Sequence, residues 1–270
     1  MRHLFRTLFC WAAPLLAPAP ASAFLRLPRF VAGNGSTITL RKRLHVNTLI
    51  TQPGTAEIEW GSLYSSDSDH FTLPATFKYT PAGPHVIWGR TEYSVAFDSI
   101  SVAELGGNRV TQFSQSVTLS ATSVLHDGEK LDIAIAPQAV YFLRDEEGAR
   151  YGAVAIARYD SGRNSLGATV GWSAATRASA TNPSGTWDVG CGYGRRLAAS
   201  GLVGKFTPHV NALWERSTGT ERIVSLFEGV EYQMTERLAF DLGGQHVGVN
   251  GAPVDHQLTF GITLNVGKLQ

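Results

Sequence analysis

Short stretches of alternating apolar and polar residues fill most of the chain after residue 54. The clearest stretch is 258–266, where small or polar residues separate five apolar ones: Leu258, Phe260, Ile262, Leu264 and Val266. Successive side chains of a β-strand point to opposite faces, so this stretch has one apolar and one polar face. The pattern predicts a strand that lies between an apolar environment and a polar one.

Eleven further segments of similar length precede it, and turn-forming residues separate them. Together with 258–266 they predict strands near 55–65, 71–80, 85–98, 109–123, 130–143, 149–159, 165–177, 186–197, 203–216, 221–234 and 237–247. We expect a longer loop near 99–107, around Gly106-Gly107. Bacterial single-chain barrels have an even number of antiparallel strands. The sequence therefore predicts an all-β fold: a closed antiparallel up-and-down transmembrane β-barrel of about twelve strands, in which the last strand pairs with residues 55–65.

Two segments break the simple alternation. In 149–159, Val154 and Ile156 share a face with Arg158, whereas Tyr151 and Tyr159 lie opposite, so the outward face is ambiguous. In 221–234, Glu228 interrupts an otherwise apolar face. A β-bulge or a shifted register would account for that glutamate.

The first residues have the features of a secretory signal. Arg2 and Arg6 precede a short apolar core at 8–16, and Ala21-Ser22-Ala23 provides small residues for cleavage. The apolar core is too short for a membrane-spanning helix. We therefore expect a signal peptide over 1–23, an N-terminal periplasmic segment over 24–54 and an outer-membrane barrel over 55–267. The basic run Arg41-Lys42-Arg43 is interpreted as a solvated part of the periplasmic segment.

Composition agrees with this organisation. The chain has 28 glycines and only 17% charged residues, which suits strands with one lipid face and one lumen face. Its formal net charge of +1 falls to about −1 without Arg2 and Arg6, so we expect no nucleic-acid partner. Cys191 is the cysteine that remains after cleavage, which excludes an intramolecular disulfide, and we interpret it as a small apolar residue on a strand.

If the apolar faces meet lipid, the polar faces gather inside the barrel. The candidate lumen-lining residues are Glu57, Glu59, Lys78, Arg90, Glu92, Asp98, Asp132, Asp188, His209, Glu215 and Asp241. Those on the first three strands are expected to form a cross-strand ladder of ion pairs. Two interpretations remain open: a polar core that fills a narrow barrel, and a charged lining that selects which solutes pass.

No arrangement of residues points to catalysis. His246 has no serine at suitable strand spacing. His209, Asn211 and Glu215 share one face, but this triple resembles polar packing more than an acyl-transfer site. The histidines lack metal-ligand spacing, and the run Gly190-Cys191-Gly192-Tyr193-Gly194 lies in a strand pattern and does not open a helix. We expect no enzyme, no metal and no cofactor.

Four short stretches carry a resemblance to a known family. They are 52–59 (QPGTAEIE), 206–211 (FTPHVN), 229–235 (GVEYQMT) and the run from Asp255 through Leu258 to Gly261-Ile262-Thr263. The chain resembles, over about residues 50–267, outer-membrane transporters associated with phenol-degradation pathways in Gram-negative bacteria. The resemblance implies an outer-membrane channel for a small, hydrophobic solute, with outer-membrane lipid and the barrel assembly machinery as partners. Many outer-membrane proteins end in phenylalanine, whereas this chain ends Gly267-Lys268-Leu269-Gln270.

Two other functions stay open at this point. One is an exported β-protein that binds a ligand or partner without transport, and the other is an outer-membrane lipid hydrolase. A soluble β-protein would point its apolar faces inward and its charges outward, opposite to a membrane barrel.

Overall fold

The computed structural model describes most of the chain after residue 49. The described residues are 50–65, 70–83, 90–105, 108–113, 116–143, 148–178, 183–198, 201–202, 205–219, 222–249 and 253–268. The predicted signal peptide and most of the predicted periplasmic segment lie outside these residues.

Thirteen strands make up the regular structure. They are β1 (Thr55–Ser65), β2 (His70–Thr80), β3 (Thr91–Leu105), β4 (Asn108–Phe113), β5 (Ser116–Asp127), β6 (Leu131–Phe142), β7 (Ala149–Ser161), β8 (Asn164–Ala175), β9 (Gly185–Arg195), β10 (Phe206–Ser217), β11 (Arg222–Gln233), β12 (Leu238–Val249) and β13 (Asp255–Lys268). No helix in this described part of the chain is long and apolar enough to cross a membrane.

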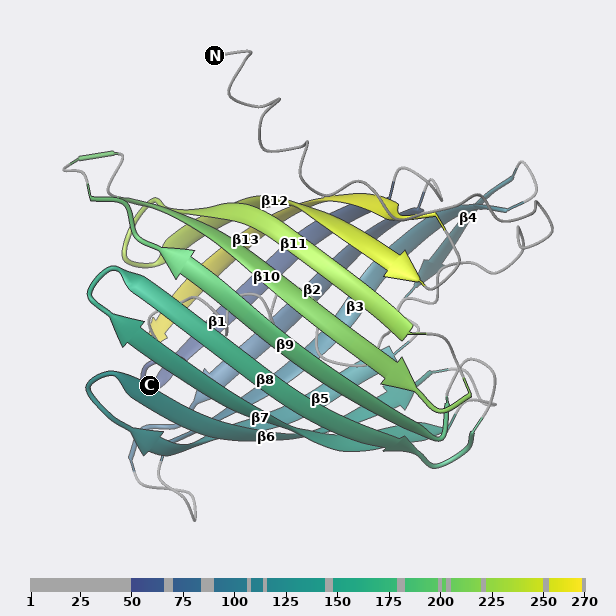
Figure 1. The fold of residues 1–270 in the computed structure, drawn as a ribbon, viewed down its shortest axis with the longest axis horizontal. Helices are drawn as coiled ribbons and strands as arrows, with labels where there is room; N and C mark the ends of the chain where they lie inside the picture. Colours follow the sequence, from purple (N-terminus) through teal and green to yellow (C-terminus); the bar gives the residue numbers. More distant parts are fainter. Residues whose placement is uncertain are drawn as a thin grey trace.

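Twelve of the strands close into one antiparallel barrel (Figure 1). Neighbours in sequence pair with each other, and β13 closes the barrel on β1, in a register that sets Tyr64 opposite Leu258 and Ile58 opposite Leu264. The predicted pairing of the last strand with the first is confirmed. The end of the barrel where β1 begins and β13 finishes is called the terminal end below, and the other is the far end.

The thirteenth strand corrects one prediction. β3 continues to Leu105 and pairs with the short β4, while β5 takes the next place in the barrel wall. The expected loop at 99–107 and the expected strand at 109–123 were therefore wrong in their bounds. Alternation continues through Ile100 and Val102, so the strand does not stop at Asp98. Residues 99–105, which were expected in the loop, belong to β3.

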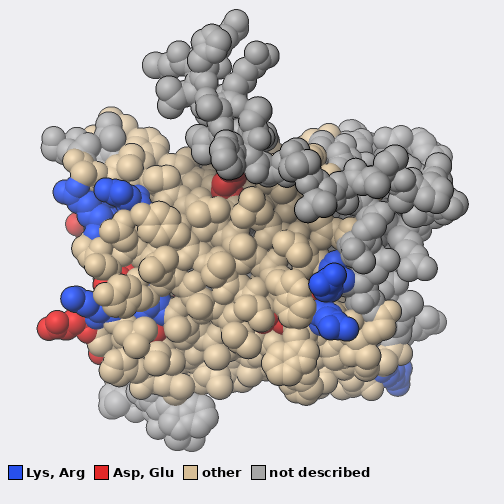
Figure 2. Space-filling view, viewed as in Figure 1, with Lys and Arg blue, Asp and Glu red and all other residues tan. Residues whose placement is uncertain are grey.

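The barrel is apolar outside and polar inside. On β1, Trp60 is 55% exposed, whereas Glu59 beside it is 1% exposed. Figure 2 shows the same division on one face: a broad middle band carries few charged residues, and most of the described lysine, arginine, aspartate and glutamate side chains lie toward its two ends. A soluble barrel would place these faces the other way round. An apolar outer band flanked by charge is the surface of a membrane barrel.

The ambiguous strand β7 turns an apolar group inward. Val154 and Ile156 are buried inside together with Arg158, and Tyr151 and Tyr159 are exposed outside. Ala134 and Ala136 of β6 pack against the two aliphatic side chains, and Val124 of β5 joins them. These five residues form an apolar strip on an otherwise polar inner wall.

Glu228 stays in register, so the bulge suggested for it is wrong. The pairings of β11 with both neighbours run past this residue without a shift. Its side chain is 57% exposed on the outer face, 3.8 Å from Nε2 of His246. Nδ1 of His246 lies 2.8 Å from Nδ1 of His256 on β13. The three side chains form a polar outer cluster on an otherwise apolar surface.

Candidate functional site: the barrel interior

The inner wall carries a large excess of negative charge. By the alternation of the strands, ten acidic and three basic side chains of the described residues face inward, which leaves a formal excess of seven negative charges. The acids are Glu57, Glu59, Glu92, Asp132, Asp160, Asp188, Glu215, Glu231, Asp241 and Asp255, and the bases are Lys78, Arg150 and Arg158. The whole chain is close to neutral. The fold therefore concentrates acidic residues in the interior.

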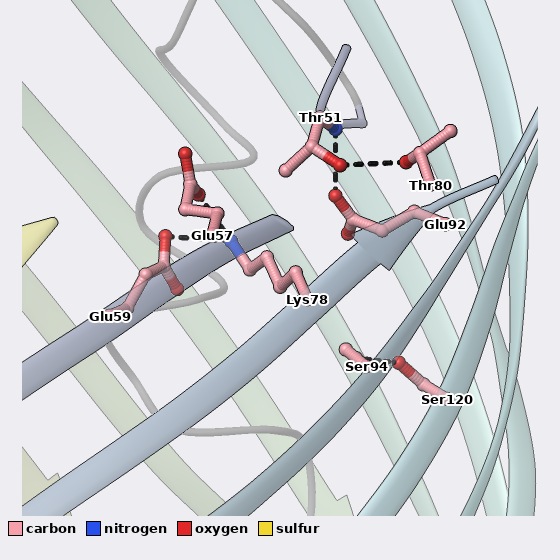
Figure 3. Close-up of polar contacts among 8 residues, drawn as sticks. All are labelled: Thr51, Glu57, Glu59, Lys78, Thr80, Glu92, Ser94 and Ser120. Carbon is pink, nitrogen blue, oxygen red and sulfur yellow. Dashed lines mark hydrogen bonds and ion pairs between the residues drawn. The ribbon is translucent and has the colours of Figure 1, made fainter. Parts of the chain in front are cut away.

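One acidic group lies on β1, β2 and β3 near the terminal end (Figure 3). Nζ of Lys78 is 2.6 Å from a carboxylate oxygen of Glu59 and 3.5 Å from one of Glu57. β1 presents the two glutamates two positions apart, and the antiparallel register sets Lys78 opposite Glu57. We call Glu57, Glu59, Lys78 and Glu92 the β1–β3 cluster. It contains three acids and one base.

The chain that precedes β1 contacts this cluster from inside the barrel. The backbone N–H of Thr51 donates to Oε2 of Glu92 over 2.7 Å, and the Thr51 hydroxyl is 2.7 Å from that of Thr80. Gly54 then has a φ of +81°, a left-handed conformation that favours glycine, and the chain reverses into β1. Figure 3 shows Thr51 joined to both Thr80 and Glu92 by dashed lines. Residues 50 and 51 therefore lie against the inner wall.

A second group lies on β7, β8, β9 and β10 near the far end. The Arg150 guanidinium donates to the hydroxyls of Ser173, at 3.1 Å, and Thr186, and to the carbonyl of Pro183, at 3.0 Å. The Thr186 hydroxyl in turn lies 2.7 Å from that of Ser217. We call these residues the Arg150 network. These hydrogen bonds go to neutral groups, and the Glu215 carboxylate also interacts electrostatically with the Arg150 guanidinium.

Two carboxylates lie beside this network. Asp188 of β9 is paired in register with Glu215 of β10, and both are buried. Gly171 on β8 leaves room for the Asp188 side chain, since a Cβ there would collide with its carboxylate. The same arrangement recurs at Gly261, where a Cβ would collide with the carboxylate of Asp241. Glycine thus lets acidic side chains lie along the wall.

A third group occupies the terminal end of β6 and β7. Arg158 lies 3.0 Å from Asp132 and 2.8 Å from Asp160. Arg158 also lies next to the apolar strip on its own strand, two positions beyond Ile156. This wall therefore combines an aliphatic surface with a fixed ionic group.

The histidine considered for catalysis is engaged in packing. The His209 ring stacks on Phe227 with centroids 5.2 Å apart, and its Nδ1 is 3.3 Å from the carbonyl of Thr207. Among the residues that the structure describes, no group of three or more histidine, cysteine, aspartate or glutamate side chains is arranged to hold a metal.

Most of the sequence-predicted lining residues point inward. The exception is Arg90, which precedes β3 and forms an ion pair with Asp127, with both side chains exposed. The Asp98 side chain is not among those described. The predicted ladder on the first three strands joins Lys78 to Glu57 and Glu59, while Glu92 contacts Thr51. The residues that the structure brings inside are Glu57, Glu59, Lys78, Glu92, Asp132, Asp188, His209, Glu215 and Asp241.

Sequence reasoning missed several interior side chains. Arg150 and Arg158 were not predicted because the outward face of β7 was ambiguous. Asp255 was not predicted because it precedes the apolar alternation of the last strand, yet Ser65 donates to it over 2.7 Å. The signal was present: Asp255 and Gln257 share the parity of Thr259, which faces inward.

Comparison with solved structures finds membrane barrels. An outer membrane channel from Pseudomonas putida F1 matches with a TM-score of 0.59 and 9% sequence identity over 80% of this chain and 97% of the other. The NanC porin matches with a TM-score of 0.55 and 10% identity, and the KdgM porin with 0.54 and 9%, each over 77% of this chain and 98% of the other. No family model and no curated protein matches the sequence.

Fold and surface together define the class. The chain folds as a closed twelve-stranded antiparallel β-barrel of the kind found in outer-membrane channels and porins, with an apolar exterior. At 9 to 10% identity these similarities establish the fold, and the function has to be argued from the interior.

Proposed function

We propose that this protein is an outer-membrane channel that passes small solutes, with a preference for cationic or neutral ones over anions. The observation that carries the proposal is the inner wall, where among the described residues acidic side chains outnumber basic ones by seven. Fixed charges on a narrow lining set which ions enter, because they attract counter-ions and repel like charges. A twelve-stranded barrel has an interior between that of a filled eight-stranded barrel and an open large porin, which suits small solutes.

The apolar strip refines the choice of solute. Val124, Val154 and Ile156 belong to one apolar cluster with Ala134 and Ala136 on an otherwise polar wall. An aromatic or aliphatic part of a solute gains from burial against such a surface, while its polar part hydrogen-bonds to the lining hydroxyls. This arrangement supports the small, partly hydrophobic solute implied by the resemblance to transporters associated with phenol degradation.

The remaining sequence predictions belong to the same proposal. Cleavage of residues 1–23 delivers the chain across the inner membrane, and the barrel assembly machinery then inserts residues 55–267 among outer-membrane lipids. Ring stacking of His209 on Phe227 favours packing over hydrolysis, so the proposal assigns no enzymatic role.

Solute-swelling of liposomes tests this proposal. Purified barrel is reconstituted, and three solutes of similar size are compared: a neutral one, a monocation and a monoanion. The neutral and cationic solutes should enter several-fold faster than the anion, because the lining repels anions. Equal exclusion of all three, or faster entry of the anion, would contradict the proposed function.

A matched pair of variants separates the lining from general effects. Glu57→Gln with Glu59→Gln removes two inward carboxylates, whereas Glu228→Gln removes one on the outer face. The first variant should admit the anion faster, and the second should behave as the unmodified protein. If anion entry changes equally in both variants, the β1–β3 cluster does not determine the selectivity of the channel.

A further inference from the structure

We propose that three side chains on the inner face of β10, Glu215, Leu213 and Asn211, bind a small organic cation with an ammonium group, a short apolar middle and a hydroxyl end. This inference rests on the proposed channel function, and it specifies the chemical class of the solute. The three side chains share the inner face because they lie two positions apart on one strand. We call them the β10 row.

Asn211 is the residue that points to a ligand. It is 7% exposed, yet neither its amide nitrogen nor its amide oxygen has a hydrogen-bond partner among the described residues. Buried polar groups are almost always hydrogen-bonded, and an unpaired one is unfavourable. An amide donates through its nitrogen and accepts through its oxygen, so it matches a solute hydroxyl, which does both.

A second unpaired polar group lies beside the β10 row. The Thr169 hydroxyl on β8 is buried, and within the described part of the chain it has no hydrogen-bond partner. A Cβ at Gly190 of β9 would lie 2.6 Å from this hydroxyl and 3.6 Å from Cδ1 of Leu213. Gly190 is in register with both residues, so the hydroxyl and the leucine extend over this glycine from the two neighbouring strands.

Glu215 gives the β10 row a negative end. It is buried on the inner face in register with Asp188 of β9, and it interacts electrostatically with Asp188 and Arg150. Two carboxylates beside one guanidinium leave a net negative charge at this level of the wall. Such a charge attracts an ammonium group and repels a carboxylate.

The spacing of the β10 row sets the length of the solute. Glu215 and Asn211 are four positions apart on one strand, which is about 13 Å between their Cα atoms. The two side chains, and a hydrogen bond of about 2.9 Å at each end, reduce the gap to the length of a short hydrocarbon chain. Leu213 lies between the two ends, and an apolar chain gains from burial against it. A linear amino alcohol has its groups in this order.

Isothermal titration calorimetry of the purified protein in detergent tests the proposal. The probes are 5-amino-1-pentanol, pentylamine, which lacks the hydroxyl, and 1-pentanol, which lacks the ammonium group. The amino alcohol should bind about fivefold more tightly than either of the others, because only it satisfies both ends of the row. Equal or tighter binding of either shortened probe would overturn the proposal.

Two substitutions assign the two ends of the solute. Asn211→Leu removes the amide at similar size and should weaken binding of the amino alcohol about fivefold, while binding of pentylamine stays unchanged. Glu215→Gln removes the charge and should weaken binding of both amines. Thr118→Ala on β5 changes another buried polar residue and serves as the matched control, which should alter neither affinity. If Asn211→Leu weakens both amines equally, or neither, the proposal is wrong.

Thermal stability separates a binding role of Asn211 from a structural one. Because an unpaired buried amide is unfavourable, Asn211→Leu should keep or raise the temperature at which the folded band disappears in heat-modifiable migration. A lower temperature would show that the amide stabilises the wall, and it would overturn the proposal.

The calorimetry does not depend on conductance, so the two proposals can fail separately. A protein that conducts cations but binds the three probes equally would overturn the inference about the β10 row and leave the channel proposal intact. A protein that prefers the amino alcohol but passes no solute would contradict the channel proposal, and the β10 row would remain a binding site.

Discussion

The β1–β3 cluster and the Arg150 network place a buried cation on the inner wall in two different ways. Lys78 lies between two carboxylates, and a third carboxylate contacts the chain before β1. Arg150 instead donates to hydroxyls and a carbonyl from three neighbouring segments. The first group has a surplus of charge, whereas the second uses the many donors of one guanidinium to join strands.

This difference assigns different roles to the two groups. Negative side chains on the inner wall attract cations and repel anions, so we interpret the three acids of the β1–β3 cluster as a contribution to electrostatic selection of what enters. Hydrogen bonds between a guanidinium and neutral acceptors hold the wall together and change its potential less. We therefore assign selectivity to the β1–β3 cluster and rigidity to the Arg150 network.

The largest effect is expected from Lys78→Gln. Without the ammonium, Glu57 and Glu59 are left buried without their shared cation from β2, which should lower the free energy of unfolding by about 3 kcal/mol. Urea titration of the barrel in lipid vesicles measures this loss. The triple change of Glu57, Glu59 and Lys78 to glutamine should recover most of it, because no buried charge then remains among the three. If the triple variant is as unstable as Lys78→Gln, the loss of stability is caused by altered packing and not by uncompensated buried charge.

A smaller loss, about 2 kcal/mol, is expected from Arg150→Gln because several donors to buried acceptors disappear. The exposed Arg222→Gln serves as its control in the same titration. Ion selectivity should change less in Arg150→Gln than in Lys78→Gln. If Arg150→Gln shifts selectivity more, the assignment of roles to the two groups is wrong.

The smallest effect is expected at the outer cluster, where a carboxylate faces the apolar exterior. Replacing Glu228 by leucine should raise the free energy of unfolding by about 1 kcal/mol, since an acidic side chain on the lipid face is unfavourable. The same vesicle titration reports it. A loss of stability would show instead that the contact with His246 outweighs the exposure to lipid.

Sequence alone predicts the wall of this barrel well because its signal is local. Alternation of two residues identifies a strand, and the glycine and proline turns between strands fix their order, so the pairing of Leu258 with β1 follows. The same signal fails where a strand extends past the barrel, as β3 does with β4, because alternation does not show where the wall ends.

The interior is harder to predict because its contacts are not local. The sequence identifies Glu59 and Lys78 as polar positions, and strand order makes them neighbours. It does not identify Arg150 as an interior residue, because Val154 and Ile156 on the same face look lipid-facing. It also does not show that Thr51 contacts the inner wall, since that depends on a hydrogen bond to Glu92, 41 positions away in the sequence.

The reversal potential of the unmodified protein in a planar bilayer under a potassium chloride gradient tests the central claim most directly. The described part of the inner wall has seven excess negative charges, which predicts a reversal potential close to that of potassium, and therefore cation selectivity. Heat-modifiable migration shows that the recorded channel is folded. A reversal potential closer to the equilibrium potential of chloride would then contradict the account.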